Sequence, residues 1–311
     1  MVADRKPQSQ IPGDRPIACF GEAITDLICE RNLMAGETAD CYVPHPGGAL
    51  ANVAVAVARA GVSVALVGGV GDDRWGSWLG ETLESEGVST KWLARLERAE
   101  TPVAVVEFGP DNEPSFRVYG EQIGPTMAAT SGFLHEAVTG SSALIVGSNT
   151  MVGETEREVT RRAIELARDR GRPVLLDPNY RPNRWAKVET AIEFCRELTG
   201  VSDVIKLNRT EAELITGNSD LLTAARDLVT LGPALAVVTD GTGTVFTAGA
   251  IEEVHHPEQV PTVSPLGAGD AFMGGLAAGL ARRGWDLELV GEVLPEAVGS
   301  AAAAVRGWGA Q

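Results

Sequence analysis

Short apolar runs alternate with amphipathic segments along most of this 311-residue chain. The apolar runs have the length of buried strands, whereas the segments between them have the periodicity of helices. Glycines follow several of the helical segments, as is typical of helix C-termini. This alternation predicts a mostly parallel sheet covered by helices on both faces. The expected strands are 17–20, 64–67, 143–146, 174–176, 204–207 and, as the last core strand, 235–239; the expected helices are 49–60, 75–86, 154–170, 210–216 and 221–231.

Two segments, about 26–46 and 101–120, depart from this alternation. Both contain β-rich pieces, and the second has a run of turn residues at 110–114. We interpret them as hairpins inserted into one α/β domain of residues 17–311. Open α/β sheets bind ligands at the carboxyl ends of their strands, so these hairpins predict a small β lid over a ligand site. An edge extension of the main sheet is the alternative.

Composition excludes several classes of function. The chain has 26 basic and 42 acidic residues, which is a formal net charge of −16. Nucleic acids and anionic membranes bind basic surfaces, so neither is an expected partner. Residues 1–16 are polar and predict a flexible tail without a signal peptide. The four cysteines form no C-x-x-C pair, and no apolar run reaches the ~18 residues of a membrane span. We therefore expect a cytoplasmic protein without a disulfide framework or zinc site.

The stretch Gly267-Ala268-Gly269-Asp270 precedes a long apolar run and predicts a turn that leads into a helix. Glycines let backbone N–H groups approach an anion closely, and a helix N-terminus favours negative charge. An aspartate there repels phosphate, but it suits a reaction in which a substrate hydroxyl loses its proton beside that phosphate. The stretch therefore indicates phosphoryl transfer to an alcohol. The alternative is a tight turn with Asp270 as a helix N-cap.

Candidate sugar ligands come earlier in the chain. Gly47 and Gly48 stand at a loop-to-helix junction, and Asn52 follows about one turn into the helix. Its amide can bond sugar hydroxyls both as donor and as acceptor. Asp26 follows the first strand, where a carboxylate can accept bonds from two neighbouring hydroxyls. The alternatives are a satisfied core amide for Asn52 and a solvated turn for Asp26.

Asn208 and Glu211 come directly after the strand 204–207 and share a face at the start of the next helix. Mg²⁺ prefers few carboxylates and many waters, so this pair can hold the water shell of the ion. An N-terminal capping arrangement is the competing interpretation, and both can be true.

Other candidates lie at the ends of two further strands. Thr239, Gly241 and Gly243 form a turn of the kind that contacts nucleotides, at and beyond the end of the last core strand. Arg181 follows the strand 174–176, and it either contacts a phosphate or pairs with an acid on this acidic surface. No Gly-Lys dipeptide occurs, which excludes a Walker A loop.

Three motifs, in their order and spacing, resemble the ribokinase-like PfkB family of carbohydrate kinases over the chain from about residue 17 onward. The resemblance implies a three-layer αβα sandwich with a small β lid. It also implies ATP and Mg²⁺ as cofactors and transfer of the γ-phosphoryl group to a sugar hydroxymethyl group. The motifs are Gly47-Gly48-x-x-x-Asn52, Asn208-x-x-Glu211 and Gly267-Ala268-Gly269-Asp270-x-Phe272-x-x-Gly275.

The same resemblance implies a role for each matching residue. Asp270 would be the general base, beside an anion hole made of backbone N–H groups. Magnesium and phosphate, the sugar and the nucleotide would each have their own ligands. The anion hole would be Gly267, Ala268 and Gly269, the metal and phosphate ligands Asn208 and Glu211, the sugar ligands Asp26, Gly47, Gly48 and Asn52, and the nucleotide contacts Thr239 and Gly241.

Within this family the chain is most similar to fructokinases, on Gly21-Glu22, Asp177-Pro178-Asn179-x-Arg181 with Trp185, and Lys206-x-Asn208-x-x-Glu211. The 2-keto-3-deoxygluconate kinases and the ribokinases or nucleoside kinases share much of the scaffold and are alternatives. The candidates for distinguishing a neutral ketose from a sugar acid are Arg117, Tyr119 and Arg181.

The chain departs from the family pattern at Ser264-Pro265-Leu266, where most members have Asp-Thr-Thr. That aspartate helps to form a monovalent-cation site in many members, so its absence argues against activation by potassium. Pro265 also lacks an N–H group, so the turn can enter differently.

Two alternatives come from other classes of protein. One is a sugar sensor without catalysis on the same fold, against which the intact Asp270 argues. The other is a Rossmann-type oxidoreductase that uses a turn at Gly69, but this stretch lacks the third glycine of a dinucleotide fingerprint. For assembly, a β lid with exposed edges predicts a possible homodimer through the lid.

Overall fold

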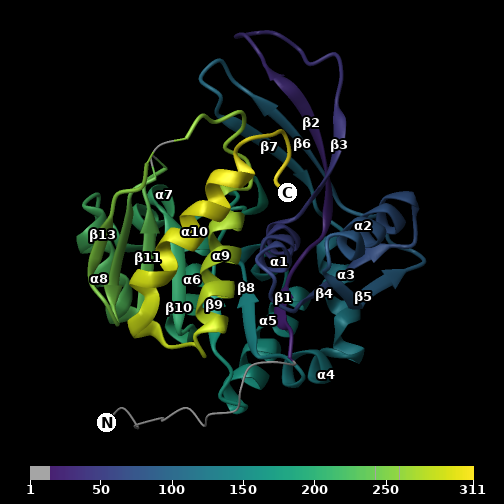
Figure 1. Cartoon of the computed structure of the whole chain (residues 1–311). Helices are drawn as coiled ribbons and strands as arrows, with labels where there is room; N and C mark the ends of the chain where they lie inside the picture. The colour runs from purple at the N-terminus through teal and green to yellow at the C-terminus, as the bar shows by residue number, and fades with distance from the viewer. Residues whose placement is uncertain (1–14, 242, 259) are drawn as a thin grey trace.

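The computed structural model describes residues 15–241, 243–258 and 260–311 (Figure 1). The predicted tail at 1–16 therefore lies outside the described residues, apart from Arg15 and Pro16. Each of the strands and helices predicted above is present. Short 3₁₀ helices join some of them: η1 (Ala129–Gly132), η2 (Ser148–Met151), η3 (Pro182–Arg184) and η4 (Leu287–Leu289).

The main sheet of the described chain has nine strands in the order β13-β12-β11-β10-β9-β8-β1-β4-β5. Neighbouring strands are parallel from β11 through to β5, which confirms the mostly parallel sheet. The prediction that 235–239 is the last core strand is wrong, because β12 and β13 extend that edge as an antiparallel pair. The bounds are β1 (Ile17–Phe20), β4 (Val64–Gly71), β5 (Ser89–Leu96), β8 (Ala143–Val146), β9 (Val174–Leu176), β10 (Val204–Asn208), β11 (Leu235–Thr239), β12 (Val245–Gly249) and β13 (Glu253–His255).

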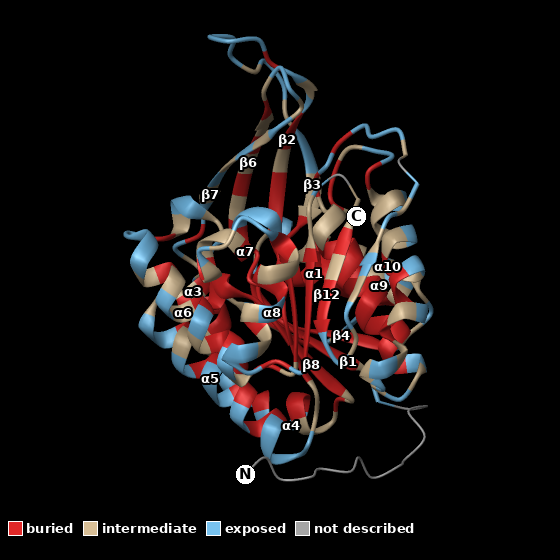
Figure 2. Ribbon diagram, turned by 90° about the vertical axis from the view of Figure 1, so that its left-hand side faces the viewer, coloured by how far each residue is buried: buried red, intermediate tan, exposed pale blue. Residues whose placement is uncertain are grey.

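Helices cover both faces of the main sheet, and the three layers are visible in Figure 2. One apolar cluster fills the interface with α3 to α8, and a second fills the interface with α1, α2, α9 and α10. The αβα sandwich is confirmed. In the described ranges, no helix combines the length and the apolar character needed to cross a bilayer. The bounds are α1 (Ala49–Arg59), α2 (Arg74–Ser85), α3 (Ile123–Ala128), α4 (Leu134–Thr139), α5 (Glu154–Asp169), α6 (Val188–Val201), α7 (Arg209–Thr216), α8 (Leu221–Leu231), α9 (Ala268–Arg282) and α10 (Val290–Ala304).

The two segments that break the alternation form a separate sheet of four strands, in the order β3-β2-β6-β7. This sheet stands apart from the helical layers in Figures 1 and 2, so the edge-extension alternative is wrong. Its side chains pack with Leu266 and Ala310, which lie next to the glycine-rich turn. The strand bounds are β2 (Ile24–Asn32), β3 (Val43–Gly47), β6 (Val103–Phe108) and β7 (Pro114–Tyr119).

Glycines let α9 pack closely between α1 and α10. A Cβ atom added at Gly274 would lie 2.4 Å from the Cβ atom of Ala56 in α1. On the other side of the helix, a Cβ atom at Gly275 would lie 2.8 Å from the Cα atom of Ala297 in α10. Because an alanine Cβ atom has no alternative rotamer and the Cα atom of Ala297 belongs to the backbone, neither of these two atoms can move away by a rotamer change. The glycines thereby determine how deeply the start of α9 sits in the fold.

We expect Gly274→Ala to destabilise the protein by about 1–3 kcal/mol, since the added methyl group overpacks the contact with α1. The matched control is Gly299→Ala in α10, where a Cβ atom meets nothing within 4 Å. That control should stabilise the helix by about 0.5–1 kcal/mol through backbone entropy. Urea unfolding of both variants measures the difference. Equal stability of the two variants would contradict the proposed packing constraint.

Candidate active site

A cavity of about 710 Å³ lies at the carboxyl ends of the main-sheet strands and is lined on another side by the small sheet. Five strands contribute a polar residue at or just after their ends, and the first turns of α1 and α9 also line the space. Parallel strands bring their carboxyl ends to one edge of a sheet, which is why these distant segments meet. The five residues are Glu22, Asn149, Asp177, Asn208 and Thr239.

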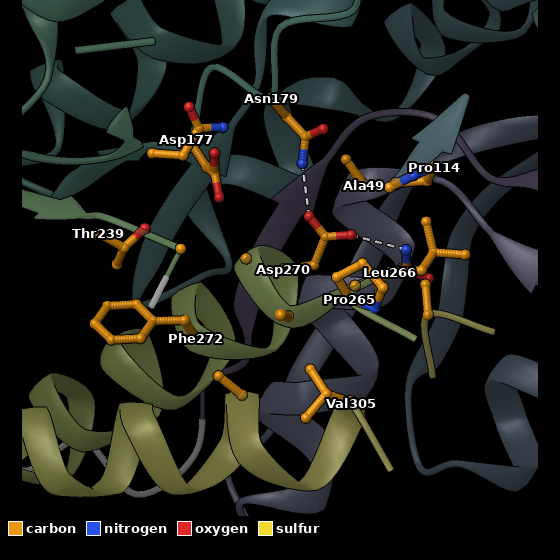
Figure 3. Close-up of a pocket in the computed structure, with 18 of the residues that line it drawn as sticks. Ala49, Pro114, Asp177, Asn179, Thr239, Pro265, Leu266, Asp270, Phe272 and Val305 are labelled. Carbon is orange, nitrogen blue, oxygen red and sulfur yellow. Dashed lines mark hydrogen bonds between the residues drawn. The ribbon is translucent and has the colours of Figure 1, made fainter. Parts of the chain in front are cut away.

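Asp270 lies in the first turn of α9 and is only 5% exposed. Asn52 Nδ2 donates to its Oδ2 atom at 2.8 Å, and Asn179 Nδ2 donates to its Oδ1 atom at 2.6 Å; both bonds are drawn in Figure 3. The helix N-cap is Gly267, with a φ of 76°, so the alternative in which Asp270 caps the helix is wrong. Its carboxylate belongs to the cavity and is oriented by two amides from other segments.

The pKa of Asp270 is raised to about 6, chiefly because burial disfavours the charged form and secondly because Asp177 lies nearby. The Asn52 amide and the positive charges of Arg181 and Lys206 limit the rise in this pKa. A general base works best when its pKa lies near the operating pH. At neutral pH this carboxylate is therefore ionised and still basic enough to accept a proton.

Asp26 is 4% exposed, so the alternative of a solvated turn aspartate is wrong. Its pKa is raised to about 7, mainly by burial, with Asp270 and Glu22 adding to the rise and Arg181 opposing it. Gly47 lies directly against this side chain, because a Cβ atom at Gly47 would be 2.2 Å from Asp26 Oδ2. Any larger residue at position 47 would displace the carboxylate.

The start of α1 presents Asn52 to the cavity. Gly48 is the N-cap with a φ of 99°, a conformation that favours glycine, and a Cβ atom there would lie 2.4 Å from the Glu22 carbonyl oxygen. Asn52 Oδ1 accepts a bond from Gln311 Nε2 at 2.9 Å, while its Nδ2 atom donates to Asp270. Asn52 is thus a buried, satisfied amide, as the core interpretation expects, but its partner is the cavity carboxylate.

Asn208 and Glu211 form the capping box of α7. Asn208 Oδ1 accepts from the Glu211 N–H at 2.9 Å, and Glu211 Oε2 accepts from the Asn208 N–H at 2.9 Å. The other carboxylate oxygen of Glu211 accepts from the Tyr180 N–H at 2.7 Å. The capping interpretation is confirmed, and Glu211 also ties α7 to the loop that follows β9.

The donor set around this pair suits a hydrated magnesium ion. Burial and the neighbouring Asp177 raise the pKa of Glu211, while Lys206 and two backbone N–H groups favour its charged form. Within the ranges that the structure describes, no group of three or more His, Cys, Asp or Glu side chains is arranged to hold a metal ion. Mg²⁺ commonly keeps several waters and binds one or two carboxylates together with substrate phosphates, so it needs no such cage.

The turn that follows β11 contributes Thr239, Gly241 and Gly243 to the cavity wall. Both glycines have positive φ values, 82° and 102°, in the left-handed region that glycine adopts at low cost. Thr242, between them, lies outside the described residues. These positions bring backbone close to the cavity.

Arg181 lines the cavity, and its guanidinium lies 4.7 Å from the ring centroid of Phe116 in β7. The cavity-facing residues of β7 are Pro114, Phe116 and Val118. The alternation of a strand therefore turns Arg117 and Tyr119 to the other face, where both are exposed. The prediction that these two residues select the substrate is wrong, whereas Arg181 remains a candidate.

Sequence reasoning assigned no role to Asn179 or Lys206, which the fold brings beside Asp270. Asn179 has a φ of 48°, which is uncommon for a residue other than glycine and is typical of strained functional turns. Lys206 Nζ contacts Asp177 Oδ2 at 3.0 Å inside the protein. The available signal was positional, since each residue lies in or just after a buried strand whose neighbours already held candidates.

The residues that depart from the family pattern, Ser264-Pro265-Leu266, form hydrogen bonds within the turn before Gly267. Ser264 is fully buried, and its hydroxyl accepts a bond from the Leu266 N–H at 3.2 Å. The Ala268 N–H donates to the Pro265 carbonyl at 3.3 Å, a long bond for an amide. The Gly267 backbone is pressed against Ala310, whose Cα atom would lie 2.6 Å from a Cβ atom at Gly267.

Comparison with known proteins agrees with this geometry. The model of the pfkB family carbohydrate kinases matches residues 14–311. The chain belongs to this family. This carbohydrate kinase is 32% identical to a fructokinase of Klebsiella pneumoniae over 278 residues, which are 85% of this chain and 84% of that protein. The predicted family and enzyme class are confirmed.

Solved structures of the family have the same fold. A fructokinase from Xylella fastidiosa with bound ATP superposes with a TM-score of 0.83 at 28% identity, covering 95% of this chain and 93% of that one. An aminoimidazole riboside kinase from Salmonella enterica superposes with a TM-score of 0.78 at 26% identity, covering 93% of both chains. The oxidoreductase alternative is wrong, because Gly69 and Gly71 lie within β4 and form no nucleotide-binding turn.

We expect Asn179→Gly in this kinase to raise the pKa of Asp270, because the lost bond favours the ionised carboxylate. Glycine also tolerates the positive φ at this position. The acid limb of the pH profile of kcat/KM should move from about 6 to higher pH by about one unit. Asn183→Gly, at an exposed asparagine of the same loop, is the control and should leave the limb in place. An unchanged limb in Asn179→Gly would contradict this orienting role.

Proposed function

We propose that this carbohydrate kinase transfers the γ-phosphoryl group of ATP to a hydroxymethyl group of fructose. The proposal rests above all on the buried Asp270 carboxylate, which two amides orient at the N-terminal turn of α9. Because that turn favours anions and the carboxylate accepts protons, the two together suit an alcohol that attacks a phosphoryl group. ATP and fructose are proposed from the relatives, which are named as fructokinases or contain bound ATP.

In this proposal the sugar binds between the small sheet and the start of α1. Asp26 and the Asn52 amide receive its hydroxyls, and Gly47 and Gly48 let the backbone approach the ring. Asp270 accepts the proton of the hydroxymethyl group as its oxygen bonds to the γ-phosphorus. The bond from that phosphorus to the bridging oxygen breaks, and its electron pair leaves with ADP.

Backbone groups would stabilise the phosphates. The N–H groups of Gly267, Ala268 and Gly269 form the proposed anion hole at the positive end of α9. We assign the larger share to the two glycines, because the Ala268 N–H already has the Pro265 carbonyl as a partner. The nucleotide would run along the turn after β11, at Thr239, Gly241 and Gly243.

Asn208 and Glu211 are proposed to hold the water shell of Mg²⁺, which when bound would neutralise part of the phosphate charge. Their side chains are already engaged in the capping box, which favours contact through water over direct coordination. The hydrogen bond that Glu211 accepts in this box favours its charged form, against the rise in pKa that burial causes.

The small sheet is the proposed lid. It lines the cavity through alternate residues of β7 and contacts the glycine-rich turn through Leu266 and Ala310. Closure would exclude water from the phosphates and so limit hydrolysis of ATP. Its edge strands, β3 and β7, are also the surfaces through which a homodimer would form.

The nature of the cavity favours a neutral sugar over a sugar acid. Glu22, Asp26 and Asp270 line it, and Arg181 is the basic side chain that contacts the small sheet. A 2-keto-3-deoxygluconate carboxylate would therefore need Arg181 as its counter-ion. A riboside is the second candidate, because the riboside kinase of Salmonella enterica has the same fold.

The test is release of ADP from Mg-ATP with fructose, ribose, 2-keto-3-deoxygluconate, adenosine and aminoimidazole riboside, each with and without potassium. We expect fructose to have the highest kcat/KM, and potassium to change it little because Ser264 replaces the family aspartate. A riboside preferred over fructose would overturn the proposed substrate. Strong potassium activation would overturn the expected cation independence. Binding of a sugar without any turnover would favour the sensor.

We expect Asp270→Asn to lower kcat by roughly 10²–10⁴-fold, the usual contribution of a positioned general base. The asparagine keeps the size of the side chain and removes a buried charge. The Asn179 amide, whose Oδ1 atom has no hydrogen-bond partner, can turn over to accept from the new N–H group, so the fold and the affinity for sugar should remain. Single-turnover kinetics and sugar titration by calorimetry measure the two effects separately. The proposed role fails if the variant turns over at near the rate of the unmodified enzyme.

A further inference from the structure

Lys206 is a buried lysine in the apolar part of β10. Its side chain is 3% exposed, and its neighbours in β10 are Val204, Ile205 and Leu207. Lysine is almost never buried without a partner, because its ammonium group loses hydration. Here Asp177 provides that partner at 3.0 Å. A pair of apolar residues would pack here at lower cost, so the ion pair calls for a functional explanation.

The ammonium group lies among acidic side chains. Asp177 pairs with it at 3.0 Å, and Glu211 and Asp270 line the same cavity. The bond to Asp177 uses one of three N–H groups of the ammonium. Lys206 can therefore keep Asp177 and donate to an anion in the cavity that it lines.

The position of Lys206 explains the second glycine of the Gly-Ala-Gly turn. A Cβ atom at Gly269 would lie 2.8 Å from Lys206 Nζ, and Gly269 has no positive φ that would otherwise require glycine. The ammonium thus lies against the first turn of α9, where the backbone N–H groups and the helix dipole favour an anion.

Charge around the cavity makes this location significant. Among the described residues that line it, the basic side chains are Arg181 and Lys206, whereas six are Asp or Glu. Arg181 stacks over Phe116 at the small sheet. Lys206 is thus the described cation at the turn of α9, where the proposed function puts the transferred phosphoryl group.

We propose that Lys206 is a catalytic residue whose ammonium group donates to the transferred phosphoryl group, with Asp177 holding it in position. The proposal rests on the proposed kinase function. As the sugar oxygen bonds to the γ-phosphorus, the bond to ADP breaks with its electron pair and Asp270 receives the hydroxyl proton. Lys206 keeps its own protons throughout and stabilises the charge on the phosphoryl oxygens.

The first experiment replaces Lys206 by methionine. We expect Lys206→Met to lower kcat by roughly 10²–10³-fold, as for the loss of one donor to a transition-state anion. The KM for the sugar should change by less than about threefold, because the sugar is bound elsewhere. A kcat within about threefold of the unmodified enzyme would overturn the proposal.

Nucleotide binding distinguishes a purely structural role of Lys206 from direct contact with the γ-phosphoryl group. The affinity of β,γ-methylene-ATP relative to ADP, measured by calorimetry with Mg²⁺, reports on contact with the γ-phosphoryl group. This ratio should fall about tenfold in Lys206→Met, by analogy with the loss of one charged bond. Arg181→Met, which removes the other cavity cation, should raise the KM for the sugar and leave the ratio unchanged. An unchanged ratio in Lys206→Met would overturn the proposal.

Two further variants address folding. Lys206→Met leaves Asp177 buried without a partner, so the double variant Asp177→Asn/Lys206→Met removes both charges and should fold. Its kcat and nucleotide ratio should match those of Lys206→Met. Gly269→Ala keeps the lysine but displaces its ammonium group, and its effect should vanish in the Lys206→Met background. Additive effects of these two substitutions would overturn the proposal.

The nucleotide ratio requires no turnover, so it separates the two proposals. Suppose that the affinity ratio falls in Lys206→Met but the unmodified enzyme phosphorylates no sugar. The proposed kinase function would then be rejected, and the contact of Lys206 with the γ-phosphoryl group would be supported. If the unmodified enzyme phosphorylates fructose and the ratio is unchanged in Lys206→Met, the proposed function is supported and the role of Lys206 is rejected.

Discussion

The Asp270 carboxylate lies out of solvent at the first turn of α9, and most of the site is arranged around it. A buried carboxylate is costly, and burial raises its pKa to about 6. Two hydrogen bonds, donated by the side-chain amides of Asn52 and Asn179, compensate for the lost hydration while leaving the carboxylate able to accept a proton. These donors come from α1 and from the loop after β9, so the geometry exists only when these segments are assembled around the start of α9.

The same constraint explains the glycines of the site. Gly47 leaves room for Asp26, Gly267 for the C-terminal segment at Ala310, and Gly269 for the ammonium of Lys206. Each absent side chain is replaced by a specific neighbour from elsewhere in the fold. Gly274 has the equivalent purpose in the scaffold, where it brings α9 against α1. Small residues thus create a crowded polar site within a close-packed interior.

The charged side chains of the cavity, taken by themselves, would repel a polyphosphate. Six Asp or Glu side chains and two basic ones line the cavity in the described residues. The capping box at Asn208 and Glu211, the ion pair of Lys206 with Asp177, and the amides around Asp270 each satisfy carboxylates locally. This local pairing favours the charged forms of the acidic groups, whereas the raised pKa values of Asp26 and Asp270 show that burial and neighbouring carboxylates still oppose their ionisation.

The sequence by itself determined the αβα fold, the inserted hairpins and the glycine-rich turn before Asp270, because these depend on local periodicity and spacing. It did not identify β12 and β13 as further strands, since both are short and neither is a continuous apolar run. The sequence also suggested Arg117 as a residue that selects the substrate, whereas the alternation of β7 directs its side chain away from the cavity. Asn179 and Lys206 join the site only through the tertiary structure, because parallel strands far apart in sequence end at one edge of the sheet.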